Sequence, residues 1–264
     1  MKTIVYQSYR TNNVPDWIKT CMQTVKAWAD SNKFDYQTFD DSFFEYVPEW
    51  FRTKTNNEIC PVTDLARLIV AKQFLSEGYE RAIWIDADML VFDPEKLVVN
   101  IERDFLFCHE IWLLKDAANA LHVSHRVNNS FTVFCRNNVH LDFFIDACLR
   151  IGRQKITIGK LDLGTNFLSK LRNILPFPLM ENVGILSPAL MREIVLEEPL
   201  GIIEYAQNLI SPIACVNLCA SLQGRDIQGV VADDSLYTNV IHALLSTRGD
   251  IINGLRQPEL LRDS

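Results

Sequence analysis

The sequence lacks several features that would narrow its class at once. No apolar run in the 264 residues approaches the roughly 20 residues of a membrane-spanning helix. The first residues enter a strand-like run without a long apolar stretch, so we expect neither a signal peptide nor an integral membrane segment. Internal repeats, low-complexity tracts and Pro/Gly/Ser-rich linkers are also missing, which favours one domain over residues 1–264.

Excess positive charge and paired cysteine motifs are missing as well. The formal net charge of −7 argues against non-specific nucleic-acid binding, which needs a basic surface. The seven cysteines are scattered, form no Cys-x-x-Cys pair and match no usual zinc spacing. We therefore expect reduced thiols in a cytoplasmic protein.

The first half of the chain alternates strand and helix patterns. We expect a helix that Thr63 caps, with Asp64 in its first turn and Gly78 at its end. The alternation predicts an α/β fold with a mostly parallel sheet. The other expected elements here are strands at 3–8, 34–39 and 82–85 and a helix at 16–29.

The second half is less regular. We expect Gly152 to follow a helix, the polar tail 256–264 to fray, and the mixed segment 201–222 to have no clear assignment. The expected elements are strands at 104–108 and 131–135 and helices at 141–151, 161–174 and 187–197.

Two carboxylates, Asp86 and Asp88, follow the expected strand 82–85. Residues two apart in a strand share a face, so both side chains would point the same way. Two close carboxylates repel, and a divalent cation such as Mn²⁺ or Mg²⁺ removes the conflict while taking other ligands from phosphates. The position at a strand end, where α/β sheets bind ligands, favours a metal and diphosphate site. A structural turn remains an alternative.

A second pair, Asp64 and Arg67, lies three residues apart on one helix face. One interpretation is an intrahelical ion pair. The other places Asp64 on a ribose hydroxyl and Arg67 on a diphosphate, which arginine grips bidentately. The nearby Asp-x-Asp strand favours the functional interpretation.

The segments Thr63-Asp64-Leu65-Ala66-Arg67 and Trp84-Ile85-Asp86-Ala87-Asp88 together resemble the glycosyltransferases with a sugar-binding Asp-x-Asp region. That group includes the capsular-polysaccharide and initiating mannosyltransferases. The run DADMLV at 86–91 is also similar to the glycogenin-like family, whose Asn-Ser-Gly element resembles the Asn-Asn-Ser run at 128–130.

The resemblance implies a fold and a division of labour. The fold is the nucleotide-diphospho-sugar transferase fold called GT-A, a mostly parallel twisted sheet flanked by helices. Residues 1–135 would bind the nucleotide sugar, and the more helical residues 136–264 would face the acceptor. The resemblance puts Asp88 and Asp86 at the metal as catalytic residues, with Asp88 as the direct ligand and Asp86 also near the donor sugar and the ribose. It also implies that Asp64 and Arg67 hold the ribose and the donor sugar or diphosphate, and that Tyr6, Gln7 and Tyr9 flank the base.

Two residues of the later half complete the candidate set. Asn217, in a segment that resembles the family's C-terminal metal motif, would be a third metal ligand; a polar turn is the alternative. Asp162 would be an acceptor-side catalytic group, or else the N-terminal Asp of a helix.

Together these residues predict a hexosyltransferase that uses Mn²⁺ or Mg²⁺. It would move a hexose from a UDP- or GDP-sugar to a hydroxyl of a glycan or other acceptor, and the resemblance implies retained stereochemistry. Arg67 would stabilise charge on the leaving group. The alternatives are a nucleotide-sugar-binding protein without turnover and a phosphatase of the haloacid-dehalogenase type.

Overall fold

The computed structural model describes residues 1–100, 104–115 and 120–255. The expected fraying of residues 256–264 lies outside the described residues. The chain forms two compact units, and each is described by itself below. The first unit comprises 1–87, 99–109 and 126–180, and the second comprises 88–98, 110–125 and 181–264.

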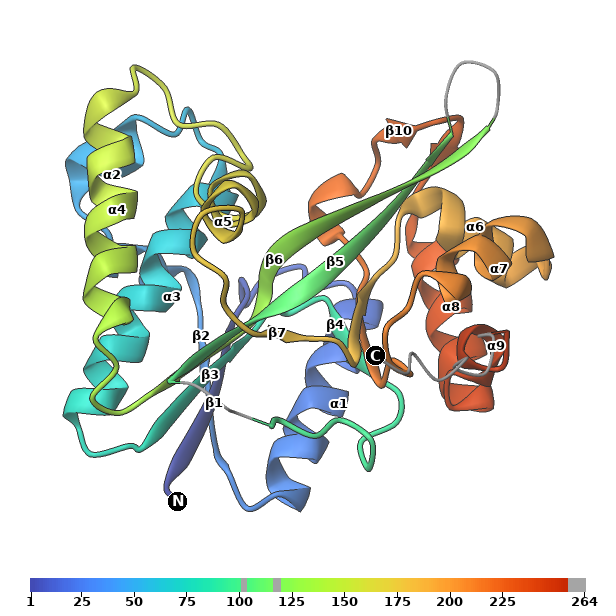
Figure 1. The fold of residues 1–264 in the computed structure, drawn as a ribbon, viewed down its shortest axis with the longest axis horizontal. Coiled ribbons are helices and arrows are strands. Elements are labelled where there is room, and N and C mark those ends of the chain that lie inside the picture. Colours follow the sequence, from blue (N-terminus) through green and yellow to red (C-terminus); the bar gives the residue numbers. More distant parts are fainter. Residues whose placement is uncertain (101–103, 116–119, 256–264) are drawn as a thin grey trace. The chain divides into compact units, whose positions relative to one another are not determined.

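The main sheet is mixed and mostly parallel, as predicted for an α/β fold (Figure 1). The central strand β3 pairs in parallel with β1 and antiparallel with β6. In order across the sheet, the strands are β2 (Asp35–Phe39), β1 (Thr3–Ser8), β3 (Arg81–Ile85), β6 (Leu121–Cys135), β5 (Phe105–Lys115) and β7 (Leu179–Met180).

Helices cover both faces of this sheet within the first unit. Trp84 and Thr132 are paired across β3 and β6, and Ile85 pairs with Phe131 on the opposite face. Phe131 packs against Trp28 of α1, whereas Trp84 stacks on Phe43. The helices of this unit are α1 (Asp16–Ser31), η1 (Asp41–Tyr46), α2 (Glu49–Thr53), α3 (Ile59–Ser76), α4 (His140–Gln154) and α5 (Thr165–Arg172).

The second unit contains a small sheet in the order β4-β9-β8, a two-stranded ribbon, four α-helices and one 3-10 helix within its described residues. β4 pairs antiparallel with β9, and β9 pairs in parallel with β8. The strands are β4 (Met89–Val91), β8 (Val183–Ile185), β9 (Cys215–Asn217), β10 (Asp226–Ile227) and β11 (Val230–Val231). The helical segments are α6 (Pro188–Leu196), α7 (Pro199–Gln207), η2 (Ala220–Leu222), α8 (Asp234–Thr247) and α9 (Asp250–Asn253).

Two expected helix ends are wrong. Thr63 does not cap α3, because the helix begins at Ile59, and the Thr63 hydroxyl donates to the Ile59 carbonyl one turn earlier. Asp64 is therefore in the helix body. Gly152 does not follow α4 but lies within it, where a β-carbon would meet the Phe51 ring at 2.7 Å. Gly152 is thus a packing residue.

The strand-face argument for the two aspartates is also wrong. β3 ends at Ile85, and Asp86 and Asp88 lie in the connection to β4. β4 belongs to the other sheet, so no continuous strand sets the directions of the two side chains. The division between the units falls after Ala87. Alternation along a strand requires one extended ladder, and this segment has none.

Element lengths differ from the expectations in the second half. β5 and β6 are much longer than 104–108 and 131–135, because polar residues such as His122 and Ser124 interrupt the apolar pattern of β6 without breaking the strand. α5 is shorter than 161–174, because Gly164 forms its N-terminal boundary. The segment 201–222 resolves into most of α7, β9 and η2.

Candidate functional site

The candidate site begins at the carboxyl end of β3, where Asp86 follows the strand. The Asp86 amide donates to the Ser130 carbonyl at 2.8 Å, and the Gln7 side-chain amide donates to the Asp86 carbonyl at 3.0 Å. The Tyr36 hydroxyl in turn donates to the Gln7 carbonyl oxygen at 2.7 Å. Three neighbouring strands therefore hold the backbone of Asp86 in place.

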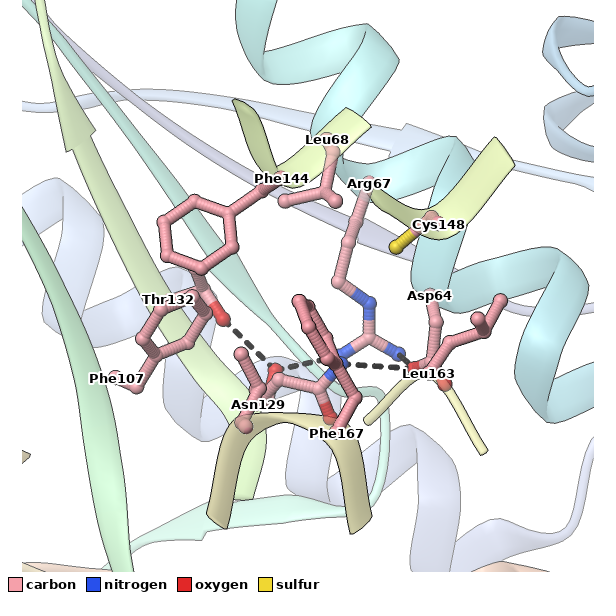
Figure 2. Close-up of a pocket in the computed structure, with 11 residues that line it drawn as sticks. Asp64, Arg67, Leu68, Phe107, Asn129, Thr132, Phe144, Cys148, Leu163 and Phe167 are labelled. Carbon is pink, nitrogen blue, oxygen red and sulfur yellow. Dashed lines mark hydrogen bonds and ion pairs between the residues drawn. The ribbon is translucent and has the colours of Figure 1, made fainter. Parts of the chain in front are cut away.

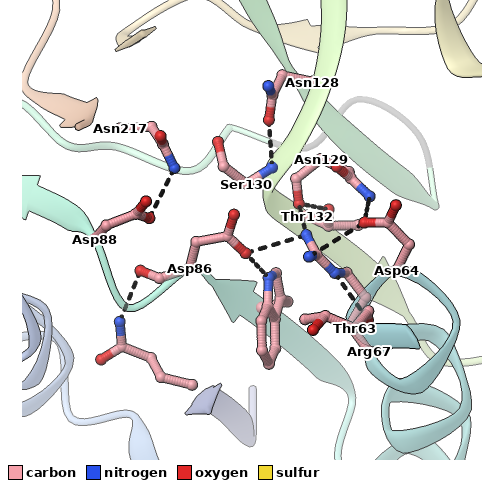
Figure 3. Close-up of polar contacts among 12 residues, drawn as sticks. Thr63, Asp64, Arg67, Asp86, Asp88, Asn128, Asn129, Ser130, Thr132 and Asn217 are labelled. Carbon is pink, nitrogen blue, oxygen red and sulfur yellow. Dashed lines mark hydrogen bonds and ion pairs between the residues drawn. The ribbon is translucent and has the colours of Figure 1, made fainter. Parts of the chain in front are cut away.

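The arginine of α3 joins two carboxylates in this unit (Figure 3). One guanidinium nitrogen of Arg67 lies 3.3 Å from Asp64, and another lies 3.1 Å from Asp86. Asp64 and Arg67 share a helix face because they are three residues apart. The two separate motifs recognised in the sequence, Asp64/Arg67 and the first Asp of Asp-x-Asp, thus form one cluster.

Further contacts hold the Arg67 guanidinium in place between Asp64 and Asp86. It donates to the Asn129 carbonyl at 2.5 Å and to the Thr63 carbonyl at 3.2 Å. It also lies over the Trp84 ring, 4.8 Å from the centroid, and the Trp84 indole N–H donates to Asp86 at 2.5 Å. The Arg67 side chain is only 5% exposed, so these contacts replace its hydration.

The cluster contains two acids and one arginine. Burial raises the pKa of Asp64 to about 6, and this effect outweighs the attraction of Arg67 and the hydrogen bond from Asn129. Burial also raises the pKa of Asp86, against the lowering effects of Arg67 and the Trp84 N–H. Asp86 is the more accessible acid, with 27% of its side chain exposed against 7% for Asp64. A single guanidinium cannot fully compensate two buried carboxylates.

Asn129 belongs to the cluster, although the sequence analysis assigned it no role. Its side-chain amide donates to Asp64 at 2.8 Å, and its carbonyl accepts bonds from Arg67 and from Thr132. The preceding Asn128 accepts from the Ser130 amide at 2.7 Å and shapes the local turn. The resemblance of the run at 128–130 was the available signal, but it did not identify Asn129 as the residue that holds Asp64.

Asp64 and Arg67 also line a small cavity of about 10 Å³ (Figure 2). Asn129 and Thr132 add polar groups to its wall, and phenylalanines such as Phe107 and Phe144 close it. A volume of this size is about that of one water molecule. The cavity therefore belongs to the polar network of the site and is too small for a substrate.

In the second unit, Asp88 lies beside Asn217. The Asn217 side-chain amide donates to one Asp88 oxygen at 2.9 Å, and the Ala220 backbone amide donates to the other at 2.7 Å (Figure 3). The Leu218 amide donates to the Asp88 carbonyl at 3.1 Å, so the connection to β4 and the end of β9 are tied together. Asn217 itself accepts from the Cys219 amide at 2.7 Å.

The Asp88 and Asn217 pair fits the chemistry of a hard divalent cation. Both residues carry oxygen atoms of the type that Mg²⁺ and Mn²⁺ prefer as ligands, and both are buried, at 9% and 6% exposed. In this arrangement the Asn217 nitrogen faces Asp88, and the Asn217 oxygen accepts from the Cys219 amide. Two protein ligands with the remainder from phosphates are typical for Mg²⁺. Among the described residues no group of three or more His, Cys, Asp or Glu side chains could hold a metal.

The residues at the end of β1 have different environments. Tyr6 is 1% exposed, and its hydroxyl donates to the Arg67 backbone carbonyl at 2.6 Å. This hydrogen bond ties β1 to α3 at the position of Arg67. Gln7 is fully buried and holds Asp86. Tyr9 is half-buried, with the Arg10 guanidinium 5.5 Å from its ring centroid. Contacts of these residues with a base stay predictions.

Asp162 precedes α5 and closes a loop. It accepts from the Gly159 amide at 2.7 Å and pairs with Lys155 at 2.8 Å. Partial burial raises the pKa of Asp162, but the contacts with Lys155 and the Gly159 amide outweigh it and lower the pKa below its ordinary value. The carboxylate is therefore ionised at neutral pH. The contacts describe a loop-closing residue, and a catalytic role for Asp162 stays a prediction.

No disulfide joins any of the seven cysteines, all of which lie within the described residues. Within the described ranges, no helix combines the length and apolar character needed to cross a membrane.

Comparisons with known proteins give structural similarities only. No family model and no curated protein sequence matches this chain. A crystal structure of a glycosyltransferase involved in the glycosylation of the major capsid of PBCV-1 has 10% sequence identity and a TM-score of 0.44, over 82% of this chain and 94% of that chain. The apo-form glycosyltransferase GlyE of Streptococcus pneumoniae TIGR4 has 9% identity and a TM-score of 0.40, over 99% of this chain and 66% of that chain. Neither similarity, at these TM-scores, assigns the chain to a family.

Proposed function

We propose that this protein is a metal-dependent glycosyltransferase that moves a hexose from a UDP- or GDP-sugar to a hydroxyl group of a glycan or other acceptor. The observation that carries the proposal is the Asp64–Arg67–Asp86 cluster. A buried guanidinium shared by two carboxylates at the carboxyl end of a parallel strand is suited to an anionic ligand that also carries hydroxyls. A nucleotide sugar has both groups.

Each residue of the cluster would bind a different part of the donor. Asp86 is the most exposed of the three and would accept hydrogen bonds from the donor sugar and ribose hydroxyls. Asp64 would hold the ribose, and Arg67 would pair with the diphosphate. Charge develops on the diphosphate as the glycosidic bond breaks, and a guanidinium already fixed by Asn129 and Trp84 stabilises that charge without reorganisation.

Asp88 and Asn217 would hold the metal through a carboxylate and an amide oxygen, and Asp86 would lie near it. When bound, Mn²⁺ or Mg²⁺ neutralises the diphosphate leaving group and orients it. The Asn217 amide would have to present its oxygen, which accepts from the Cys219 amide, while the Ala220 amide keeps Asp88 in place. Asp162 would serve on the acceptor side, and retention of stereochemistry belongs to the same proposal.

The test is donor turnover with Mn²⁺ and a panel of UDP- and GDP-sugars, read as release of the nucleoside diphosphate with and without acceptor glycans. We expect metal-dependent release for one donor. Asp88→Asn should abolish metal-dependent donor binding with unchanged circular dichroism, because an amide cannot supply the anionic ligand. Asp41→Asn, at an exposed acid of η1, is the matched control and should behave as the wild type.

The alternatives give different results in the same experiment. Tight donor binding without release, for every donor and acceptor, would identify a nucleotide-sugar-binding protein. Mg²⁺-dependent hydrolysis of an aryl phosphate that disappears in Asp86→Asn would identify a phosphatase. If Asp88→Asn binds metal and donor as the wild type does, the metal assignment is wrong.

A further inference from the structure

A second surface of the first unit combines basic and apolar side chains away from the Asp64–Arg67–Asp86 cluster. It is formed by α2, by the C-terminal end of α4 and by the loop that leads to α5. We call it the basic apolar face. It consists of Trp50, Lys54, Arg153, Lys155 and Ile156.

Direct contacts make this face continuous. The Lys54 ammonium donates to the carbonyls of Gly152, Arg153 and Lys155 at 2.9, 3.2 and 2.9 Å and so joins α2 to the end of α4. The Trp50 ring lies 5.5 Å from the Arg153 guanidinium and 6.0 Å from the Lys54 ammonium. Figure 1 shows α2 beside this end of α4.

The apolar part of the face is exposed on an ordered loop. Ile156 is 95% exposed, and Trp50, which contacts Arg153, is 37% exposed. The Lys155–Asp162 ion pair closes the loop across its base, and the Ile158 amide donates to the Lys54 carbonyl at 2.9 Å. Almost the whole Ile156 side chain is therefore in contact with water, and this exposure of apolar surface is unfavourable.

The charge of this region is opposite to that of the protein. Residues 146–172 contain six Lys and Arg residues and two Asp residues, whereas the chain has a net charge of −7. Both acids are paired, Asp146 with Arg150 and Asp162 with Lys155. A locally basic surface on an acidic protein is complementary to an anionic partner.

The mixture of side chains selects the kind of anionic partner. A hydrated polyanion such as a nucleic acid would pair with the basic groups but leave Ile156 in water. The boundary of a lipid bilayer accepts an aliphatic side chain among the acyl chains, a tryptophan at the headgroup level, and Lys or Arg against anionic headgroups. We infer that the basic apolar face docks the protein onto the surface of a bilayer rich in anionic phospholipid.

The test is flotation with vesicles of phosphatidylcholine alone or of phosphatidylcholine mixed with phosphatidylglycerol. The wild type should float with the mixed vesicles only, and less at high salt, because salt screens the basic groups. The double variant Ile156→Glu/Arg153→Glu should lose at least about tenfold in vesicle affinity, since it removes the inserted side chain and reverses one charge. Leu200→Glu, which changes a leucine 75% exposed in the second unit, is the control and should bind like the wild type.

Three results would overturn the inference. They are failure of the wild type to float with mixed vesicles, equal loss in the control variant, and binding to a soluble polyanion such as polyphosphate or RNA that is stronger than binding to vesicles. The assay needs no turnover, so its result is independent of the proposed glycosyl transfer. Neither Ile156 nor Arg153 contacts the donor cluster, and the double variant should keep the donor turnover of the wild type in solution.

Discussion

Removal of the Arg67 guanidinium is the perturbation that the cluster geometry makes most informative. Arg67→Met keeps much of the aliphatic bulk beside Trp84 but leaves Asp64 and Asp86 without their shared cation. It also deprives the Asn129 and Thr63 carbonyls of a donor. The variant therefore measures how strongly the fold depends on this ion cluster.

The expected magnitude follows from burial. Arg67 and Asp64 are 5% and 7% exposed, so the loss of one partner leaves a carboxylate that water cannot solvate. Breaking a buried ion pair on one side typically costs about 3–5 kcal/mol of unfolding free energy. The loss of the Arg67–Asp86 pair adds less to this cost, because Asp86 is 27% exposed and water already reaches it. We expect a loss of about 3–5 kcal/mol near pH 8, which is well above the pKa of about 6 of Asp64.

The loss should depend on pH in a defined direction. Burial raises the pKa of Asp64 from 3.8 to about 6, so between these values the folded state binds more protons than the unfolded state. The stabilising effect of the protonated form is complete below pH 3.8 and is lost as the pH rises through 6, by about 3 kcal/mol. Without Arg67 the pKa rises further, so the variant should lose less stability near pH 5 than near pH 8.

The assay is equilibrium denaturation of wild type and Arg67→Met at both pH values. Arg150→Met is the matched control, because Arg150 pairs with Asp146 on the surface with 71% and 55% of the side chains exposed. It should cost under about 1 kcal/mol. Adding Asp64→Asn and Asp86→Asn to Arg67→Met should restore part of the stability near pH 8. The reasoning is refuted if Arg67→Met costs no more than the control, or costs the same at both pH values.

Two further predictions concern packing and the support of Asp86. Gly152→Ala should lower the unfolding free energy by about 1–3 kcal/mol, because the added β-carbon would lie 2.7 Å from the buried Phe51 ring. Thermal denaturation measures this loss. Phe143→Ala, at an exposed position of the same helix, is the control and should be near-neutral. Gln7→Met should cost about 1–3 kcal/mol and exceed Tyr36→Phe, because it strands both the Asp86 carbonyl and the Tyr36 hydroxyl. Equal costs for these two variants, measured by denaturant titration, would contradict the role given to Gln7.

The sequence predicted the fold class because the early elements are locally encoded. The apolar spacing of Trp17, Cys21, Val25 and Trp28 marked α1, and all four side chains are buried. Gly78 marked the end of α3 and has a positive φ of 104°, a conformation that glycine adopts without strain. These features depend on residues three or four apart in the chain, so they survive without knowledge of the tertiary structure.

The lengths of β5 and β6 and the position of Gly152 were not predictable in the same way. Each depends on a partner distant in the chain: Phe51 for Gly152, and a neighbouring strand for the polar stretch of β6. Propensity and period describe single segments, and pairing across the sheet overrides them.

The candidate site divides along the same line. The residue types and spacing of Asp64, Arg67, Asp86 and Asp88 were sufficient to select them from the sequence. Only the tertiary structure decided that Arg67 joins Asp64 to Asp86 and that Asn129 holds Asp64. The side-chain chemistry of a residue is determined by the sequence, but its partners are set by the fold, which brings Asp86 and Asn129 from other strands to Arg67 and Asp64. Burial of this cluster then raises the pKa of both carboxyl groups.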